Sequence, residues 1–378
     1  MSAMTETTEH VETLIIGAGQ TGLAAAYHLS KRGLPLLVVD ANDRIGDQWR
    51  RRYDSLRLFS PARWDGLPGK AFPAPGWSSP TGRQMADHLE AYAAWIGAPV
   101  RTGVAVDRLS PAGDGSDDLI AAAGDMRIRA RQVIVATGAF SIPNIPEIAG
   151  RLDPEIRQLH SSDYHNPSQL ADGPVLVVGL GHSGADIALE VARTHRTVVS
   201  GRPHGELPFR VLETWRARLF LPVLAFMEQH VLTIRTPIGR RASAESRILP
   251  APLLRVRRVD LDRAGVERHE SRVASVVDGR PALEDGTILD VATIIWCTGS
   301  RPDYSWIEPA VTGDDGWPVE ERGVSTVPGL YFLGVPFQYG LTSQLIDGAD
   351  RDARHVVERI ADRVRATVAA GPREPAVA

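Results

Sequence analysis

The feature that most constrains the fold is a glycine motif that occurs twice, at residues 17–22 and at residues 179–184. In the first copy a short apolar run precedes Gly-Ala-Gly-Gln-Thr-Gly, and apolar residues at helical spacing follow it. In the second copy an apolar run precedes Gly-Leu-Gly-His-Ser-Gly, again with helical spacing afterwards. A strand, a glycine turn, a helix and a second strand in this order are typical of a βαβ unit that binds a dinucleotide. The sequence therefore predicts two dinucleotide-binding units.

Each glycine of the motif has a physical role. The first permits a tight turn, the second lets the backbone approach a pyrophosphate, and the third lets the helix pack closely on the strand. The pyrophosphate then lies at the helix N-terminus, where unpaired N–H groups and the positive end of the helix dipole stabilise it. The candidate binding residues are Gly17, Gly19 and Gly22 in the first copy, and Gly179, Gly181, Ser183 and Gly184 in the second.

The two copies differ at the end of their second strand. Asp40 lies 18 positions after Gly22, whereas Arg202 lies 18 positions after Gly184. At this place a carboxylate accepts a hydrogen bond from a ribose 2′-hydroxyl, and an arginine suits a 2′-phosphate. We therefore expect the unphosphorylated ribose of FAD or NAD at the first unit and NADPH at the second.

Two further segments resemble each other. Residues 133–138 and 294–299 are apolar strands that both end in Thr-Gly, and each follows one of the glycine motifs. Small residues at a strand end permit the close approach of a ligand. We expect Gly138 and Gly299 to lie near the edge of the bound FAD.

The order of these segments predicts an α/β protein with two Rossmann-like dinucleotide-binding domains, the second inserted in the first. We expect the FAD domain to comprise residues 1–165 and 301–378, and the NADPH domain residues 166–300. An apolar strand at 330–333 and a helix over about 343–367 would return the chain to the FAD domain. The polar residues before that helix are candidates to face the flavin: Gln338, Tyr339, Thr342 and Gln344.

Composition excludes several classes of protein. With 42 Lys and Arg against 46 Asp and Glu, the net charge of −4 gives no basic field for nucleic acid. The single cysteine, Cys297, excludes an internal disulfide, a CxxC redox pair and a thiolate metal cage. We expect no metal site, a small-molecule substrate, no transmembrane segment and a cytoplasmic location; the sequence also allows a homo-oligomer.

The most apolar stretch lies within residues 208–234 and includes Leu-Phe-Leu-Pro-Val-Leu-Ala-Phe-Met at 219–227. It contains a proline and is shorter than the roughly 20 residues that span a bilayer. We expect an ordinary buried helix here, with a substrate-access wall or a membrane-touching face as the alternative.

The chain resembles the flavin-containing and Baeyer–Villiger monooxygenases, in particular their short bacterial members, over nearly its whole length. Gly-Asp-Gln-Trp at 46–49 is similar to the segment that lies beside the flavin in this family. The chain departs from the family signature at Pro154 and Ile156, where Phe and Gly are usual, and has Tyr164 where Baeyer–Villiger members carry Trp. The other segments that carry the resemblance are 52–58, 67–68, 160–164, 298–304 and 328–334.

The resemblance implies FAD and NADPH as cofactors and places Trp49 beside the flavin. It implies that NADPH reduces the flavin, which captures O2 as a C4a-peroxide and transfers one oxygen to a small organic substrate. Cofactor chemistry of this kind needs few titratable catalysts, so no catalytic residue is assigned. His160 is expected to order the domain interface rather than to transfer a proton.

Two alternatives to the monooxygenase stay open at this point. One is an NADPH-dependent flavoprotein reductase that passes electrons to a quinone or a protein acceptor without oxygenation. The other is a non-enzymatic flavoprotein that senses NADPH and binds a partner through the apolar 208–234 segment.

Overall fold

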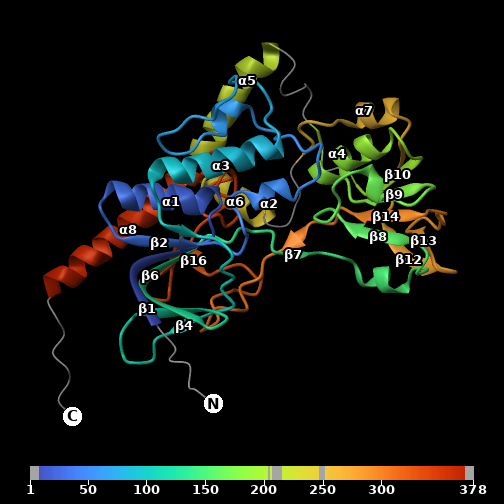
Figure 1. The fold of residues 1–378 in the computed structure, drawn as a ribbon. Coiled ribbons are helices and arrows are strands. Elements are labelled where there is room, and N and C mark those ends of the chain that lie inside the picture. Colours follow the sequence, from blue (N-terminus) through green and yellow to red (C-terminus); the bar gives the residue numbers. More distant parts are fainter. Residues whose placement is uncertain (1–7, 203–204, 207–214, 247–251, 371–378) are drawn as a thin grey trace, which may run out of the picture.

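The computed structural model describes residues 8–202, 205–206, 215–246 and 252–370. Within these residues the chain forms two main sheets, seen on the left and right of Figure 1. The larger sheet has nine described strands in the order β16-β17-β18-β6-β1-β2-β3, and β4 and β5 extend it from β6. Its strands are β1 (Thr8–Ile16), β2 (Leu36–Val39), β3 (Val100–Arg101), β4 (Arg108–Pro111), β5 (Leu119–Ala123), β6 (Met126–Val135), β16 (Glu320–Glu321), β17 (Val324–Ser325) and β18 (Leu330–Phe332).

The central strands of this sheet, β18, β6, β1, β2 and β3, run parallel. Because successive side chains of a strand point to opposite faces, β1 contributes Ile15 to one hydrophobic core and Leu14 and Ile16 to another. The first core lies beneath a helical layer, whereas the second is closed by β4, β5 and the loop around Ile307. The helices of this half are α1 (Gln20–Lys31), α2 (Asp47–Arg50), α3 (Gly82–Ile96) and α8 (Ala349–Ala370).

Helix α3 shows how local sequence sets its ends. Thr81 accepts a hydrogen bond from the Gln84 backbone N–H, and the Gln84 side chain accepts one from the Thr81 N–H, which is a reciprocal capping box. Gly97 ends the helix in the left-handed conformation, with φ of 63°. The last helix, α8, begins at Ala349 rather than near residue 343, because residues 342–348 form tight turns instead.

The smaller sheet has five described strands, all parallel, in the order β11-β10-β9-β14-β8. The strands are β8 (Arg157–His160), β9 (Val175–Val178), β10 (Thr197–Ser200), β11 (Glu267–His269) and β14 (Thr293–Trp296). Helices α4 (His182–Val191) and α7 (Arg258–Arg263) pack on one face (Figure 1). On the other side lies the hairpin of β12 (Val273–Val277) and β13 (Arg280–Leu283).

The larger sheet takes strands from before and after the smaller one, which uses residues 157–296. Strand β8 joins the smaller sheet although it precedes residue 166, the expected start of the second domain. Where the chain passes between the sheets, β7 (Ile142–Pro143) pairs antiparallel with β15 (Ser300–Arg301). Figure 1 shows this pair between the two halves of the molecule. Short 3-10 turns occur at η1 (Ala62–Trp64), η2 (Glu147–Arg151) and η3 (Pro167–Gln169).

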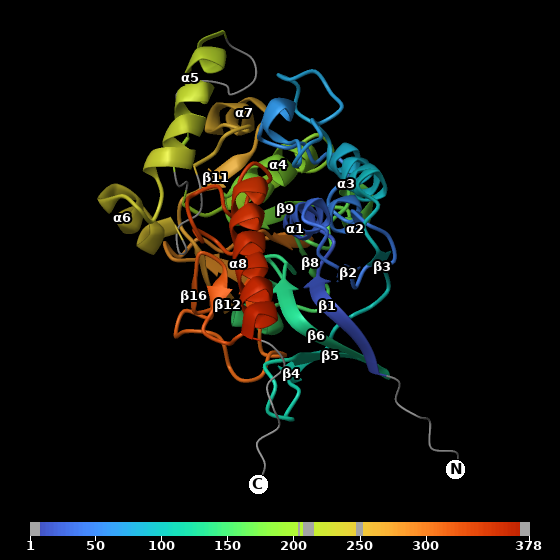
Figure 2. The same cartoon turned by 90° about the vertical axis from the view of Figure 1, so that its left-hand side faces the viewer.

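The apolar stretch forms α5 (Trp215–Phe226), a π-helical turn (Met227–Val231) and, after a bend, α6 (Pro237–Ser246). The expectation of a buried helix is wrong for its described residues, since the exposed fractions of Leu219 and Val223 are 67% and 58%. Helix α5 is apolar around its circumference, but only the side that carries Leu221 packs against Trp64 and Trp77. Figures 1 and 2 both show α5 standing clear of the sheets, and residues 208–214 lie outside the described residues. None of the helices in the described part of the chain is long and apolar enough to cross a membrane.

Candidate cofactor sites

The first glycine loop joins β1 to α1, and its three glycines have different surroundings. A Cβ built on Gly17 would overlap the carbonyl of Ala136, and one built on Gly22 would overlap the carbonyl of Gly17. The fold itself therefore requires these two glycines. Gly19 has φ of −78° and ψ of −174°, which any residue can adopt, and no atom lies within 4 Å of its Cβ position. The space in front of Gly19 is open, and no side chain caps the N-terminus of α1.

The second glycine loop, between β9 and α4, repeats this geometry. A Cβ on Gly179 would overlap the carbonyl of Cys297, and one on Gly184 would overlap the carbonyl of Gly179. Gly181 has φ of −91° and ψ of −169°, and among the described residues, its chain neighbours aside, no atom lies within 4 Å of its Cβ position and no side chain caps the helix. Ser183 lies half-buried in the first turn of α4. Both loops are therefore cradles whose middle glycine leaves room for a ligand, as the pyrophosphate of a dinucleotide requires.

Asp40 follows β2 and holds the first loop in place. Its Oδ2 accepts a 2.7 Å hydrogen bond from the backbone N–H of Ala18, and its Oδ1 accepts 2.8 Å bonds from the backbone and side-chain amides of Asn42. A carboxylate offers about four acceptor positions. Asp40 thus uses three within the protein and has capacity left for a ribose hydroxyl.

Arg202 follows β10 in the smaller sheet, one residue beyond the place that matches Asp40, because Val39 pairs with Ile16 and Ser200 pairs with Val178. Its side chain is 64% exposed, and its Nη2 lies 3.6 Å from Glu284 Oε2. An exposed ion pair at this distance contributes little to stability, so a phosphate can replace it at small cost. The Asp40 carboxylate thus contacts the first loop directly, whereas Arg202 follows Gly201, whose Cβ position is 3.1 Å from the Leu180 nitrogen of the second loop.

The Thr-Gly strand ends lie beside the loops. Gly138 follows β6, Gly299 follows β14, and both glycines are exposed. The ring of His160 lies between these elements, with Nε2 2.9 Å from the Gly299 carbonyl oxygen and Nδ1 2.8 Å from Ser162 Oγ. Burial lowers the pKa of His160. With both ring nitrogens engaged, His160 is a positioning residue at the strand end.

Trp49 and Gln344 come from segments far apart in the chain. Trp49 lies half-buried in α2 against the core under α1, α3 and α8, and Gln344 lies half-buried in the turns before α8. The position of a Cβ on Gly334, just after β18, is 3.4 Å from Thr21 Oγ1 in the first turn of α1. The C-terminal segment therefore returns to the first glycine loop, next to the turn that holds Gln344.

A buried polar contact that the sequence did not reveal joins the two halves. The Tyr53 hydroxyl donates a 3.0 Å hydrogen bond to Asp186 Oδ2, and Arg255 Nη2 lies 2.7 Å from Asp186 Oδ1. Tyr53 belongs to a loop after α2, yet its ring is part of the core of the smaller sheet. Burial raises the pKa of Asp186 and that of Tyr53. The contact fixes α4, the second cofactor helix, against the larger half of the molecule.

The sequence analysis also did not identify three carboxyl groups whose pKa values are raised. Burial raises the pKa of Asp65 to about 7 and that of Glu228 to about 7, and the charge of Asp347 adds to both. Burial raises the pKa of Asp347 itself to about 6. Ser60 Oγ donates a 2.5 Å hydrogen bond to Asp65 Oδ1, whereas Asp65 Oδ2 is buried without a partner. No motif marks these residues: Asp65 and Asp347 lie in irregular segments, and Glu228 lies in the π-helical turn after α5.

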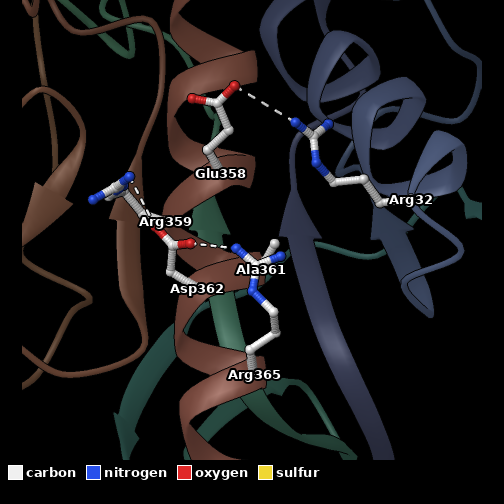
Figure 3. A pocket seen from close by; sticks show the side chains of 6 residues that line it. All are labelled: Arg32, Glu358, Arg359, Ala361, Asp362 and Arg365. Atoms are coloured by element: carbon white, nitrogen blue, oxygen red, sulfur yellow. Dashed lines mark hydrogen bonds and ion pairs between the residues drawn. The ribbon is translucent and has the colours of Figure 1, made fainter.

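A surface hollow on the outer side of α8 is separate from these sites. Figure 3 shows its charged side chains turned toward one another, with Arg32 3.6 Å from Glu358 and Asp362 between Arg359 and Arg365. None of the predicted cofactor residues lines this hollow. Exposed ion pairs of this kind contribute little, and we assign the hollow no function.

The comparisons with known proteins agree with this geometry. The family model described as pyridine nucleotide-disulphide oxidoreductase matches residues 14–208. An oxidoreductase named CzcO-like from Geobacillus kaustophilus is 36% identical over 354 residues, covering 93% of this chain and 98% of the relative. The chain belongs to the pyridine nucleotide-disulphide oxidoreductase family. The predicted Rossmann-type α/β fold is confirmed, and so is the prediction that the chain is an oxidoreductase.

Two further similarities indicate which class of oxidoreductase the chain resembles. The indole-3-pyruvate monooxygenase YUCCA1 of Oryza sativa is 29% identical over 387 residues, covering 92% of this chain and 90% of the relative. The solved flavin-containing monooxygenase from Stenotrophomonas maltophilia has a TM-score of 0.73 at 28% identity, covering 94% of this chain and 99% of that one. The predicted resemblance to flavin-containing monooxygenases is therefore confirmed, and it makes a flavoprotein enzyme the best description of the chain.

Proposed function

We propose that this enzyme is an FAD- and NADPH-dependent monooxygenase that inserts one oxygen atom of O2 into a small organic substrate. We place FAD at the loop of residues 17–22 and NADPH at the loop of residues 179–184. The observation that carries the placement of the cofactors is the pair of open glycines, Gly19 and Gly181, and the similarity to a flavin-containing monooxygenase supports the reaction. Neither the backbone angles nor the neighbouring atoms require glycine at these positions, so the close approach of a ligand is the remaining physical reason for it.

The domain division follows from this assignment. We assign residues 1–165 and 301–378 to the FAD domain and residues 166–300 to an inserted NADPH domain, except that β8 (Arg157–His160) belongs to the sheet of the NADPH domain. The alternation of strands between the two sheets supports this arrangement. The antiparallel pair of β7 and β15 then marks the two crossings of the chain.

Each cofactor has a set of residues suited to its charges. For FAD, the N-terminus of α1 offers backbone N–H groups to the pyrophosphate, and Asp40 offers its remaining acceptor position to the ribose. Trp49, Gly138 and Gln344 would border the rest of FAD. Gly299 would also lie near the edge of FAD. For NADPH, the residues are Gly179, Gly181, Ser183, Gly184 and Arg202. The Arg202 guanidinium suits the 2′-phosphate because its planar fork donates two parallel hydrogen bonds.

When bound, FAD supplies the redox chemistry, namely acceptance of a hydride from NADPH and activation of O2. The residues of this chain bind, orient and shield. Asp186 connects α4 to Tyr53 and thereby sets how the NADPH helix faces the FAD domain. Because both ring nitrogens of His160 are engaged, this residue holds the Gly299 strand end and has no free position for proton transfer.

The competing function is an NADPH-dependent reductase that passes electrons to a quinone or a protein. A thiol relay is unsuited to this chain, because Cys297 is the single cysteine and desolvation raises its pKa to about 12. The remaining distinction is the fate of O2, and it is tested with labelled oxygen.

The experiment supplies NADPH and ¹⁸O2 to purified protein with a panel of sulfides, amines and ketones. A monooxygenase places one ¹⁸O atom in the product for each NADPH consumed. The proposal fails if all the consumed oxygen is recovered as hydrogen peroxide with every substrate and quinones accelerate NADPH oxidation. That result would identify the protein as a reductase.

A further inference from the structure

Three arginines surround one phenol ring next to the turn that holds Gln344. The guanidinium carbon of Arg322 lies 4.5 Å from the centre of the Tyr339 ring, that of Arg351 4.6 Å and that of Arg235 5.7 Å. They come from the β16–β17 hairpin, from α8 and from the segment before α6. Contact with an aromatic face is favourable for a guanidinium, but it does not neutralise the charge.

The positive charge of this cluster exceeds the negative charge that the protein supplies. Arg351 pairs with the buried Asp352, with Nε 2.8 Å from Oδ1. In the described part of the chain neither Arg322 nor Arg235 forms an ion pair, and Arg322 Nε is buried without an acceptor. Burial and the charges of Arg235 and Arg351 lower the pKa of Arg322. A buried donor on a charged group is costly when it has no partner.

The backbone conformation at Arg322 is also unusual. Arg322 occupies the tip between β16 and β17 with φ of 50°, followed by Gly323 with φ of 89°. Two-residue hairpin turns with positive φ at both positions favour Asn-Gly or Gly-Gly, because other side chains are strained there. Gly323 has no room for a Cβ between Val356 and the Phe332 carbonyl, so the turn packs directly against α8. The fold thus maintains a strained position that carries a guanidinium.

The cluster adjoins the turn that we expect to face the flavin. Arg351 Nη1 donates a 3.2 Å hydrogen bond to Thr342 Oγ1, and its Nη2 donates a 3.1 Å bond to Ser343 Oγ. The Ile234 N–H donates a 2.9 Å bond to the Tyr339 carbonyl, which attaches the segment of Arg235 to this turn. The cluster therefore lies beside the turns of residues 342–348, which we expect to border FAD.

A hollow opens on one side of the cluster, and Arg235 and Arg322 are not among the residues that line it. Tyr339 and Arg351 line the hollow together with Gln229 and His230. Asp347 and Asp350 line it as well, but Asp350 pairs with Arg354 at 2.6 Å and lies 2.7 Å from His28 Nε2. Asp347 accepts a hydrogen bond from the Gln229 side chain. The acidic side chains of the hollow thus have partners of their own, and the excess of positive charge lies at Tyr339.

We propose that Arg235, Arg322 and Arg351 form an anion-binding subsite around Tyr339 that holds the carboxylate of an organic acid. As a substrate subsite it rests on the proposed function, because the bound acid would be the molecule that is oxygenated. A planar guanidinium fork matches a carboxylate in charge and geometry. The phosphates of both cofactors already have places, at the two helix N-termini and at Arg202, so the anion left for this cluster is the substrate's own.

The test measures binding and needs no turnover. Isothermal titration calorimetry on the FAD-loaded protein compares 3-phenylpropionate with its neutral amide, 3-phenylpropionamide. We expect the acid to bind at least about tenfold more tightly than the amide, and Arg322→Gln to weaken binding of the acid by about ten- to hundredfold. The affinity of the amide should not change. The second variant is Arg235→Gln, at an exposed position, and it should also weaken binding of the acid.

The control is Arg359→Gln, which removes an exposed arginine of α8 that pairs with Asp362, away from Tyr339. It should leave the affinity of the acid as in the unmodified protein. Equal affinities of acid and amide, or unchanged binding in both cluster variants, would overturn the proposal. Displacement of the acid by inorganic phosphate or NADP⁺ at equal concentration would assign the cluster to a phosphate and also overturn it. Failure of oxygen incorporation in the ¹⁸O2 experiment would leave this binding result standing.

Discussion

Replacing Gly181 by alanine separates ligand contact from folding in the second glycine loop. The backbone angles of Gly181 suit alanine, and no atom lies within 4 Å of the added methyl group. The substitution should therefore leave the free energy of unfolding unchanged, or raise it by about 0.4–1 kcal/mol by restricting the unfolded chain. The same methyl group occupies the space where a pyrophosphate would approach.

The expected loss of affinity follows from the contacts that the methyl group prevents. Hydrogen bonds between backbone N–H groups and a charged ligand contribute about 1.5–3 kcal/mol. At about 1.4 kcal/mol for each factor of ten, the Kd for NADPH should rise by about 10- to 150-fold. The measurement is a titration of the FAD-loaded protein with NADPH, together with the Tm of NADPH-free protein.

Gly184→Ala is the matched control in the same loop. Its methyl group would overlap the Gly179 carbonyl, so it should lower stability by about 1–3 kcal/mol or more and reduce the Tm. Two results would refute this reasoning: wild-type affinity for NADPH in Gly181→Ala, or a fall in its Tm as large as that of Gly184→Ala. Either would mean that the open glycine serves no ligand.

Three other substitutions test separate parts of the structure. Arg202→Ala should raise KM for NADPH about tenfold and leave KM for NADH nearly unchanged, whereas equal losses would remove its role at the 2′-phosphate. The folded pKa of Asp65, about 7, exceeds its ordinary value of 3.8, so the folded state retains a proton that the unfolded state releases. Its contribution to stability should therefore fall as pH rises from about 4 to about 7, and Asp65→Asn should flatten that dependence in urea unfolding; an unchanged slope would contradict the assignment. Tyr53→Phe removes the donor to Asp186 and should cost about 1–3 kcal/mol in denaturant unfolding, while a loss below about 0.5 kcal/mol would show that the contact is not needed to satisfy Asp186.

Local patterns in the sequence predicted the strands and helices around the two glycine loops. Each glycine motif lies between a buried strand and a helix as expected, and the spacing places Asp40 directly after β2 and Arg202 two residues after the end of β10. The ends of α3 follow from Thr81 and Gly97, because capping depends on neighbours within a few residues. Features that depend on residues close together in the sequence can therefore be predicted from it.

Contacts between distant segments were not predictable in this way. Tyr53 and Asp186 are 133 residues apart, and nothing in the spacing of either segment indicates their hydrogen bond. The arginines around Tyr339 come from three separate elements, so their shared surroundings exist only in the folded chain. Helix α5 has the composition of a buried helix, but burial depends on whether other segments cover it, and its described residues are largely exposed.

The central claim is that the two dinucleotide-binding units, at residues 17–22 and 179–184, bind FAD and NADPH at the same time. The most direct measurement is equilibrium binding of NADPH to protein whose bound FAD is counted from its visible absorbance. We predict yellow protein with one FAD in each chain, to which one NADPH binds without displacing the flavin. Protein that stays colourless after incubation with FAD, or NADPH that competes with FAD for a single place, would contradict the account.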